Sequence, residues 1–402
     1  MRCAGPMRRA GCLRRCWPMA RAEERGRAVA TGRLGQVLAG VFAAWVGSGT
    51  LFARELAADE QVLFVPGTAR SIGADRIELD VHAWIYEREE RPRLASAFAR
   101  YLGFDRAAAS AEDRERFDRR TRLFLVDSEN RKRIALRLAD GSRVELPRTR
   151  RGGRSDARVT MAASGRAADA QWIGFSAELP PGDARRFEGR ALYVPAEGLS
   201  VVSDIDDTIK DSGVADRRTL LLNTFVRPFT AVPGMAARYR ALAGAEGVRF
   251  HYVSSSPIQL LAPLLAFLEE AGFPEGSLHL REATAWRTLI PRDASAQARK
   301  RAAIERLIGD FPHRDFALVG DASEADPEIY GAIARDHPAQ VCAILIRDAS
   351  GAGRDAARYR AAFAGLADER WQVFADEDDW GAALDRCARS ARATDPQRAA
   401  AR

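Results

Sequence analysis

The feature that most limits how this chain can fold is an apolar, strand-like run that ends abruptly in two carboxylates. Leu199 to Ser203 has the pattern of a buried β-strand, and Asp204 and Asp206 follow with one residue between them. Burying carboxylates at a strand end costs free energy unless a cation or hydrogen bonds stabilise them. Because α/β proteins build their sites at the carboxyl ends of parallel strands, the pair predicts a site on a parallel sheet.

The C-terminal half of the chain alternates strand and helix patterns. The expected strands cover 199–204, 248–254, 315–320, 340–346 and 371–375, and the expected helices cover 232–244, 257–271, 294–309, 326–336, 354–366 and 379–392. This alternation predicts an α/β domain over 196–395, with a doubly wound parallel sheet that helices cover on both faces.

The preceding region has a different rhythm and predicts a smaller β-rich domain over 54–195. Alternating apolar and polar residues indicate half-buried strands, one of them at 122–126. An Ala-rich and charge-rich segment at 92–120 interrupts them and is expected to be helical. The Arg-rich and Gly-rich stretch 148–158 is expected to be an exposed loop.

Residues 1–53 look like a signal peptide and carry the whole net charge of the chain. They hold nine Arg and two Glu, which gives the full net charge of +7 and leaves the remainder neutral. An uncharged apolar run from Val37 to Val46 follows the Arg-rich part, as in an export signal. The alternative is an uncleaved membrane anchor, although a spanning helix needs about 20 apolar residues. We therefore expect an exported, periplasmic or membrane-associated protein.

Several classes of ligand are excluded by composition and spacing. A neutral body argues against nucleic acid, which requires a basic surface. Gly351-Ala-Gly353 imitates a dinucleotide fingerprint, but it lies too far from the strand end for the tight turn that such a site needs, so no dinucleotide cofactor is expected. Beyond the leader only Cys342 and Cys387 remain, and two distant cysteines predict neither a zinc site nor a disulfide framework. Cys342 is expected to be a small buried hydrophobe.

Three further polar groups lie where strands end or on a helix between them. The strand at 248–254 finishes in Ser254-Ser-Ser256, the strand at 315–320 runs into Asp321, and an expected helix carries Lys300. Lys300 is one of only three lysines, against 59 arginines, which indicates a position that needs a compact point charge. A chance lysine on a solvated helix face is the alternative.

Phosphoryl transfer needs these residue types. One carboxylate can attack phosphorus, and a second carboxyl group can protonate the leaving alkoxide and then deprotonate water. Mg²⁺ held by carboxylates relieves repulsion from the phosphate, while a hydroxyl and an ammonium stabilise the transition state. The chain supplies this set as Asp204, Asp206, Ser254, Lys300 and Asp321. For Asp206 the alternative is a helix N-cap in an ordinary loop.

Residues 199–348 resemble the haloacid-dehalogenase superfamily of aspartate-nucleophile phosphatases. The matching motifs are, in order, DxDxT from Asp204 to Thr208, Ser254 after a strand, Lys300, and GDxxxxD from Gly320 to Asp326. Longer stretches, among them 203–212, 250–257 and 326–330, resemble more closely the actin-patch-type phosphatidate phosphatases and their bacterial relatives. The resemblance implies a haloacid-dehalogenase-like fold.

The resemblance also implies roles for the motif residues. Asp204 would be the nucleophile and Asp206 the general acid and base, while Ser254 and Lys300 would bind the phosphoryl group. Mg²⁺ would be held by Asp204, the backbone carbonyl of Asp206, and Asp321.

Five further residues complete the expected site. Thr208, Lys210 and Ser255 are assigned to substrate binding, with Thr208 shaping the loop rather than reacting. Asp326 is a further metal position, and Glu324 is its neighbour. The chain has Ala322-Ser323 where the family commonly has Ser-Gly, which alters the loop before Glu324 because Gly permits backbone angles that Ser does not.

The predicted function is a Mg²⁺-dependent phosphomonoesterase that converts phosphatidate to diacylglycerol, with a phospholipid or a membrane surface as its partner. A phosphatase of a soluble phosphomonoester and a non-catalytic phospholipid-binding module are the alternatives. The apolar segment Leu220–Val226 either lines a groove for acyl chains or belongs to the core.

Overall fold

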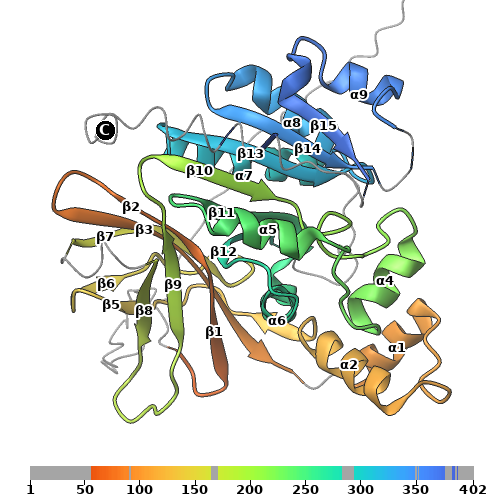
Figure 1. Ribbon diagram of the computed structural model, residues 1–402. Coiled ribbons are helices and arrows are strands. Elements are labelled where there is room, and N and C mark those ends of the chain that lie inside the picture. Colours follow the sequence, from red (N-terminus) through yellow and green to blue (C-terminus); the bar gives the residue numbers. More distant parts are fainter. Residues whose placement is uncertain are drawn as a thin grey trace, which may run out of the picture. The chain divides into compact units, whose positions relative to one another are not determined.

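Two β-sheets organise the chain, a mixed sheet and a parallel sheet (Figure 1). The computed structural model describes residues 56–89, 92–163, 171–282, 294–348, 351, 353–375, 383, 384 and 387. The expected leader at 1–53 lies outside these residues. These described residues group into one unit by their contacts. Within the described ranges, no helix has both the length and the apolar character needed to cross a bilayer.

The parallel sheet has six strands in the order β12-β11-β10-β13-β14-β15. The strands are β10 (Gly198–Ser203), β11 (Arg249–Pro257), β12 (Gly276–Arg281), β13 (Arg314–Asp321), β14 (Val341–Arg347) and β15 (Trp371–Phe374). The helices are α4 (Arg217–Phe225), α5 (Met235–Ala243), η1 (Ile258–Leu260), α6 (Leu261–Glu270), α7 (Ala294–Asp310), α8 (Asp326–Asp336), α9 (Ala357–Ala362) and η3 (Asp368–Arg370). Because β10 lies between β11 and β13, the carboxyl ends of these three strands adjoin.

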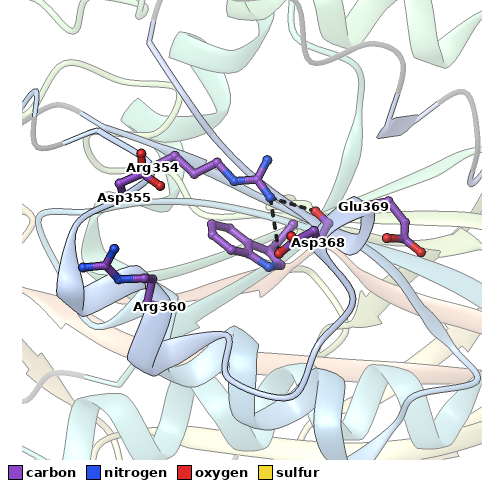
Figure 2. Close-up of a pocket in the computed structure, with 6 residues that line it drawn as sticks. Arg354, Asp355, Arg360, Asp368 and Glu369 are labelled. Atoms are coloured by element: carbon purple, nitrogen blue, oxygen red, sulfur yellow. Dashed lines mark hydrogen bonds and ion pairs between the residues drawn. The ribbon is translucent and has the colours of Figure 1, made fainter.

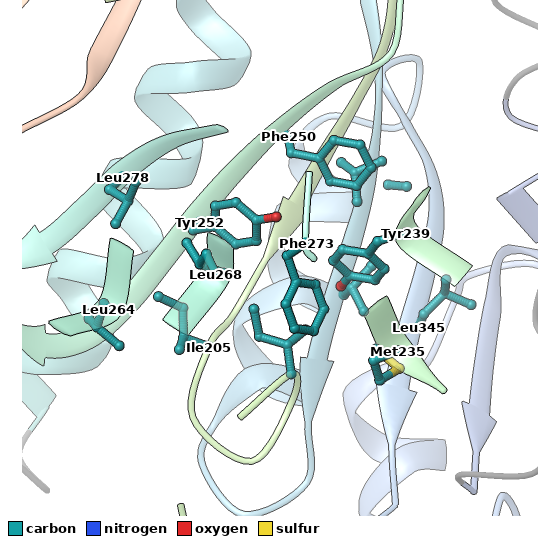
Figure 3. Packing of buried hydrophobic residues seen from close by; sticks show 14 of the residues in the cluster. Ile205, Met235, Tyr239, Phe250, Tyr252, Leu264, Leu268, Phe273, Leu278 and Leu345 are labelled. Atoms are coloured by element: carbon teal, nitrogen blue, oxygen red, sulfur yellow. The ribbon is translucent and has the colours of Figure 1, made fainter. Parts of the chain in front are cut away.

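Apolar side chains from the strands enter two separate clusters. Val201 belongs to a cluster with Tyr239 of α5 and Leu264 of α6, part of which is shown in Figure 3. Its neighbour Val202 belongs to a second cluster with Ile333 of α8. Successive residues of a strand point to opposite faces, so the sheet buries apolar side chains on both of them. Each large side chain buried in this way contributes about 1.5–3 kcal/mol.

The mixed sheet is built around one long strand. Its strands are β1 (Glu60–Val65), β2 (Gly67–Ser71), β3 (Arg76–Arg88), β4 (Val126–Ser128), β5 (Ala135–Leu138), β6 (Arg143–Glu145), β7 (Arg154–Ala162), β8 (Trp172–Glu178) and β9 (Glu188–Tyr193). β3 pairs antiparallel with β1, β2, β4 and β7, whereas β2 and β9 run parallel. The expected α/β class, with a β-rich region that precedes a parallel sheet in the sequence, is therefore confirmed.

Local expectations were wrong at several places. The segment at 122–126 ends α2 (Ala111–Arg122) and turns into β4, so it is not a strand throughout. The expected loop at 148–158 contains the start of β7, whose pairing with β3 compensates for its charged residues. The edge strand β12 was not expected. The helical interruption is present, divided into α1 (Pro92–Leu102) and α2.

The two cysteines outside the leader form a disulfide, contrary to expectation. Cys342 of β14 and Cys387 are 45 residues apart in sequence, and their Cα atoms lie 5.5 Å apart. This separation falls within the range that a disulfide requires. Sequence alone could not reveal the pair, because only the tertiary path brings position 387 back to the sheet.

Ion pairs and backbone hydrogen bonds join the mixed sheet to the parallel-sheet region. Near the C-terminal end of α7, Arg306 Nη2 lies 2.7 Å from Asp80 Oδ1 of β3. Asp310, the last residue of that helix, accepts from Arg158 Nη2 at 2.7 Å and, through its carbonyl, from Arg70 Nη1 at 2.8 Å. The helix that carries Lys300 is therefore attached to the mixed sheet at its far end.

Candidate active site

Asp204 occupies the first position after β10 and is buried, with 1% of its surface exposed. Its backbone N–H donates to the carbonyl of Val319 in β13 at 2.9 Å, which fixes the start of the loop. Its Oδ1 accepts from Lys300 Nζ at 2.9 Å, and its Oδ2 accepts from Thr208 Oγ1 at 3.2 Å. Both carboxylate oxygens are thus positioned by residues that the sequence assigned to the site.

Three aspartates converge at the ends of two adjacent strands and the start of a helix. One carboxylate oxygen each from Asp204, Asp321 and Asp326 lies within 4.8 Å of the others. Asp321 ends β13, and Asp326 begins α8. A Cβ at Gly320 would lie 2.2 Å from Asp326 Oδ2, so this close approach requires a residue without a side chain.

Lys300 from α7 is the cation nearest to these carboxylates. Its ammonium contacts Asp326 Oδ1 as well as Asp204, and Glu324 Oε2 lies 3.7 Å away. Burial lowers the pKa of Lys300, but Asp204 and Asp326 raise it well above its ordinary value. The amine is therefore charged. It contributes one positive charge to a group that contains the three aspartates and Glu324.

The remaining negative charge is not compensated. Burial raises the pKa of Asp204 well above its usual range, and Asp326 adds to the effect while Lys300 opposes it. Burial, followed by repulsion from Asp326, raises the pKa of Asp321 to about 7. Asp321 Oδ1 is buried, and no donor among the described residues reaches it. An unpartnered buried oxygen among crowded carboxylates fits an oxygen-preferring divalent cation.

Asp206 faces a different environment from Asp204. Its Oδ1 accepts from Ser212 Oγ at 2.7 Å and lies 2.8 Å from Lys210 Nζ. Its Oδ2 accepts from Ser254 Oγ at 3.1 Å and Ser256 Oγ at 2.8 Å. Burial would raise the pKa of Asp206, but Lys210 and the hydroxyl groups outweigh it and lower the pKa to about 2. Asp206 is thus a carboxylate in this structure.

Lys210, assigned to substrate binding from sequence, is buried beside Asp206. Only 2% of its surface is exposed, and its ammonium also contacts Ser212 Oγ. The ring centroid of Phe229 lies 4.8 Å from the ammonium nitrogen. In this structure Lys210 therefore neutralises Asp206, and its assigned role in substrate binding stays a prediction.

The loop after the DxDxT motif is held by Asp207. Its φ of 58° is unusual for a residue other than glycine. The carboxylate accepts from three successive backbone N–H groups, those of Ser212 at 2.8 Å, Gly213 at 2.7 Å and Val214 at 2.6 Å. These charge-assisted bonds offset the backbone strain and hold the segment that leads to α4.

A cavity of about 540 Å³ opens beside this cluster. Lys300 and Asp326 line its inner part, and Ser255 lines it with its hydroxyl 3.5 Å from Glu324 Oε2. Val214 and Ala215, just before α4, form another part of the lining. The part of the charged cluster formed by Lys300, Glu324 and Asp326 therefore faces this cavity.

Arg358 of α9 clamps the loop that carries the substituted Ala322-Ser323 pair. Its guanidinium donates to the carbonyls of Ala322 and Glu324 and makes two bonds to the Glu328 carboxylate, at 2.8 and 2.9 Å. The backbone N–H of Ser323 in turn donates to Asp321 Oδ2. The loop thus positions Asp321 without the glycine that the family commonly has.

A second cavity, of about 630 Å³, lies near the C-terminal end of the described chain and is shown in Figure 2. Arg354 extends over Trp371, with its guanidinium carbon 4.3 Å from the ring centroid, and donates to the carbonyl of Asp368 at 3.0 Å. Arginines, acidic residues and Trp371 line it, and these residues include none of those predicted for the site.

The structure brings the main predicted residues into one group. Asp204, Lys300, Asp321 and Asp326 come together, whereas Ser254 donates to Asp206. Sequence reasoning missed three contributors, of which the first is Ser256. Its hydroxyl donates to Asp206 Oδ2.

The other two missed residues are Ser212 and Arg358. Ser212 follows the DxDxT motif within a few residues, so its proximity was a usable signal. Arg358 lies beyond the last recognised motif, and no pattern distinguishes it from the many other arginines of the chain.

Comparison with known proteins agrees with this geometry. Residues 199–348 match the family described as "Phosphatidate phosphatase APP1, catalytic domain". The chain is 37% identical over 170 residues to "Phosphatidate phosphatase APP1" of Saccharomyces cerevisiae, which is 41% of this chain and 28% of the yeast protein. It is 32% identical over 155 residues to an uncharacterized protein of Schizosaccharomyces pombe, covering 38% of this chain and 25% of that protein.

The chain spans about a quarter of the length of the curated relatives that it matches. The matched segment runs from β10 to the residue after β14 and includes Asp204, Lys300, Asp321 and Asp326. The resemblance to phosphatidate phosphatases is therefore confirmed for the segment 199–348, which matches the family of APP1-type phosphatidate phosphatase catalytic domains.

Proposed function

We propose that the chain is a Mg²⁺-dependent phosphomonoesterase that hydrolyses phosphatidate to diacylglycerol and phosphate, with Asp204 as nucleophile. The observation that carries this proposal is the buried contact of Asp204 with Lys300, beside Asp321 and Asp326. The family match supports the substrate class. We also propose that β10–β15 and their helices form a doubly wound sheet of the haloacid-dehalogenase type, supported by apolar clusters on both sheet faces.

The acidic cluster has the donor set that Mg²⁺ prefers. Asp204, Asp321 and Asp326 would hold the ion, together with the backbone carbonyl of Asp206. The orphaned Oδ1 of Asp321 is the observation that supports this fit. When bound, the ion would neutralise charge on the phosphate and on the carboxylates that face it.

The chain's own residues supply the remaining chemistry. Asp204 attacks phosphorus, the bond from phosphorus to the ester oxygen breaks, and the phosphoryl group is carried as an aspartyl-phosphate. Lys300 stabilises the charge on the phosphoryl oxygens. Protonated Asp206 donates its proton to the departing alkoxide, and the product alcohol leaves.

In the second half of the reaction Asp206 takes a proton from water, and the resulting hydroxide attacks phosphorus. This step releases phosphate and restores Asp204. The carboxylate form of Asp206, which Lys210 and the hydroxyl groups favour here, suits this second step. The proton that Asp206 takes from water is the one that it donates to the departing alkoxide of the next substrate, so the acid and base steps balance over one turnover.

We also propose that the protein is exported, as the Arg-rich and apolar pattern of residues 1–53 predicts. The disulfide between Cys342 and Cys387 supports this proposal, because disulfides persist in oxidising compartments. Mass spectrometry of the protein from fractionated cells tests it. A reduced protein that is confined to the cytoplasm would overturn it.

The activity is tested by phosphate release from phosphatidate in mixed micelles, with Mg²⁺ and with EDTA. We expect metal-dependent release that falls by at least about 10³-fold in Asp204→Asn, because the nucleophile is removed. Asp75→Asn is the matched control, since Asp75 is exposed in the turn between β2 and β3. Undiminished turnover in Asp204→Asn would refute the assigned nucleophile, and turnover of soluble esters alone would refute the lipid substrate.

A further inference from the structure

Three helices form a small helical layer beside the site. α1 and α2 come from the mixed-sheet region, α4 follows the DxDxT loop, and the three lie next to one another (Figure 1). They share an apolar cluster that contains Phe98 of α1, Phe117 of α2, and Leu221 and Phe225 of α4. The segment Leu220–Val226, left open between an acyl groove and core, thus contributes mainly to the core of this layer.

At the border of this buried face, α1 exposes apolar side chains. Leu94 is 42% exposed and Tyr101 is 49% exposed, and no other large hydrophobic side chain among the described residues is as exposed. They are seven residues apart, so they lie on one face of the helix, and Ala97 lies between them on that face and is also exposed. Phe98 is four residues after Leu94 and borders the same face, with its ring centroid 6.3 Å from that of Tyr101, but it is only 7% exposed because it packs into the apolar cluster.

The same surface is basic. α1 contains two arginines and no acidic residue. The side chain of Arg217 donates to the Tyr101 hydroxyl, which places the start of α4 beside the end of α1. The exposed arginines of this surface are Arg93, Arg100, Arg217 and Arg218. A cationic surface with an aliphatic and an aromatic side chain is complementary to the interface of an anionic bilayer.

One end of this surface lies close to the site cavity along the chain. Val214 and Ala215 line the cavity, and Arg217 follows only two residues later. A phospholipid whose acyl chains stay in the bilayer can place its phosphate in a cavity only if the cavity opens next to the bilayer. The position of the basic, apolar surface meets this requirement.

We propose that the exposed face of α1 and the start of α4, comprising Leu94, Tyr101 and the four arginines, dock on the surface of an anionic phospholipid bilayer. Leu94 enters the boundary between headgroups and acyl chains, Tyr101 lies at headgroup level, and the arginines contact lipid phosphates. The proposal rests on the proposed function, because it names the surface that presents a lipid substrate to the site. It stands or fails on membrane contact, which is measured separately from turnover.

The first test is a fluorescent label at the docking surface of the full chain. The leader cysteines Cys3, Cys12 and Cys16 are replaced by serine, and an environment-sensitive dye is attached through Leu94→Cys. Vesicles of phosphatidylcholine with phosphatidate or phosphatidylglycerol should shift its emission to shorter wavelength, whereas pure phosphatidylcholine should not. The dye attached through Arg150→Cys, at a position that is 65% exposed before β7, should not respond.

This readout is local, so vesicle binding by the leader does not produce it. No shift at position 94 with anionic vesicles would overturn the proposal, and so would an equal shift at position 150. A shift that appears without vesicles as protein concentration rises would identify a second copy as the occupant and would also overturn it.

The second test separates docking from chemistry. Leu94→Asp should lower kcat/KM for phosphatidate in vesicles by about tenfold or more, because the leucine side chain that the bilayer would bury is lost. Arg93→Gln with Arg100→Gln should lower it by about fivefold for each charge at low salt, with a smaller effect at high salt. Arg150→Gln is the matched charge control. Turnover of a short-chain, monomeric phosphatidate should be unchanged in all of these variants.

Equal losses on monomeric and vesicle substrate would place Leu94 in the fold rather than in docking and would refute the proposal. If no variant, including the unmodified chain, hydrolyses any phosphate ester, the proposed function fails. The label experiment then still decides whether this surface binds anionic membranes.

Discussion

Replacing Asp321 by Asn tests whether the acidic cluster lowers the stability of the metal-free protein. The pKa of Asp321 is raised from 3.8 to about 7 by burial and by Asp326. The folded protein therefore binds more protons than the unfolded chain between these pH values, and stability falls as pH rises from about 4 to 7. Three pH units correspond to about 4 kcal/mol, which is the cost of ionising Asp321 in the fold above pH 7.

The variant removes this cost and keeps the local hydrogen bond. In Asp321→Asn, the side-chain oxygen can still accept from the Ser323 N–H, and the new amide N–H groups face Asp204 and Asp326. At pH 8 in EDTA we expect the free energy of unfolding to rise by up to about 4 kcal/mol and the Tm by roughly 8 °C, at about 2 °C per kcal/mol.

The gain should be small at pH 4, because Asp321 is then protonated in the folded protein and the pH is close to its unfolded pKa of 3.8. Thermal unfolding followed by circular dichroism measures both quantities, with Asp75→Asn as the control. Added Mg²⁺ should raise the Tm of the unmodified protein by binding the folded state and should raise that of the variant less. A variant that melts below the unmodified protein at pH 8 in EDTA would contradict the electrostatic account of the cluster.

Three further outcomes follow from particular contacts. Arg358→Met should weaken Mn²⁺ binding by about tenfold, because the guanidinium no longer holds the loop between Asp321 and Asp326. Electron paramagnetic resonance measures the binding, and Arg358→Lys should have an intermediate effect. Unchanged binding in Arg358→Met would refute this role of Arg358. Burial lowers the pKa of His82, but hydrogen bonds to Asp156 and Asp80 raise it overall, so this residue's stabilisation is present below about pH 6.5 and is lost as pH rises through the raised pKa. Denaturant unfolding at pH 6 and pH 9 should show this dependence, and in His82→Gln the histidine-dependent part should vanish. Cys342→Ser breaks a disulfide across 45 residues and should cost about 4 kcal/mol, whereas an unchanged denaturation midpoint would indicate that the bond does not form.

Sequence reasoning predicted the elements that depend on a strong local pattern. The helix expected at 326–336 has these bounds in the structure, and the strand expected at 199–204 differs by one residue at each end. β12 and β7 were not expected, because pairing with neighbours determines them more than their own residues do. The disulfide was missed for a related reason, since its partners meet only after folding.

The same distinction applies to the site. The meeting of Asp204, Lys300 and Asp321 could be predicted, because parallel strands deliver their carboxyl ends to one edge of the sheet. The contacts of Ser256 and Lys210 with Asp206 could not, because rotamers and the path of the loop decide which donor reaches a carboxylate. Motif spacing therefore located the site but not its internal hydrogen bonds.

The attachment of α7 to the mixed sheet has a consequence for how such a catalytic segment can be inherited or transplanted. Lys300 lies ten residues before Asp310, so about 15 Å of rigid helix connects the amine to the arginines of β2 and β7. A recombination event that transferred residues 199–348 alone would leave the C-terminal end of α7 without these counter-ions. The recipient protein would have to supply other cations for Asp310, or the segment 199–348 would have to be transferred together with the strands of the mixed sheet.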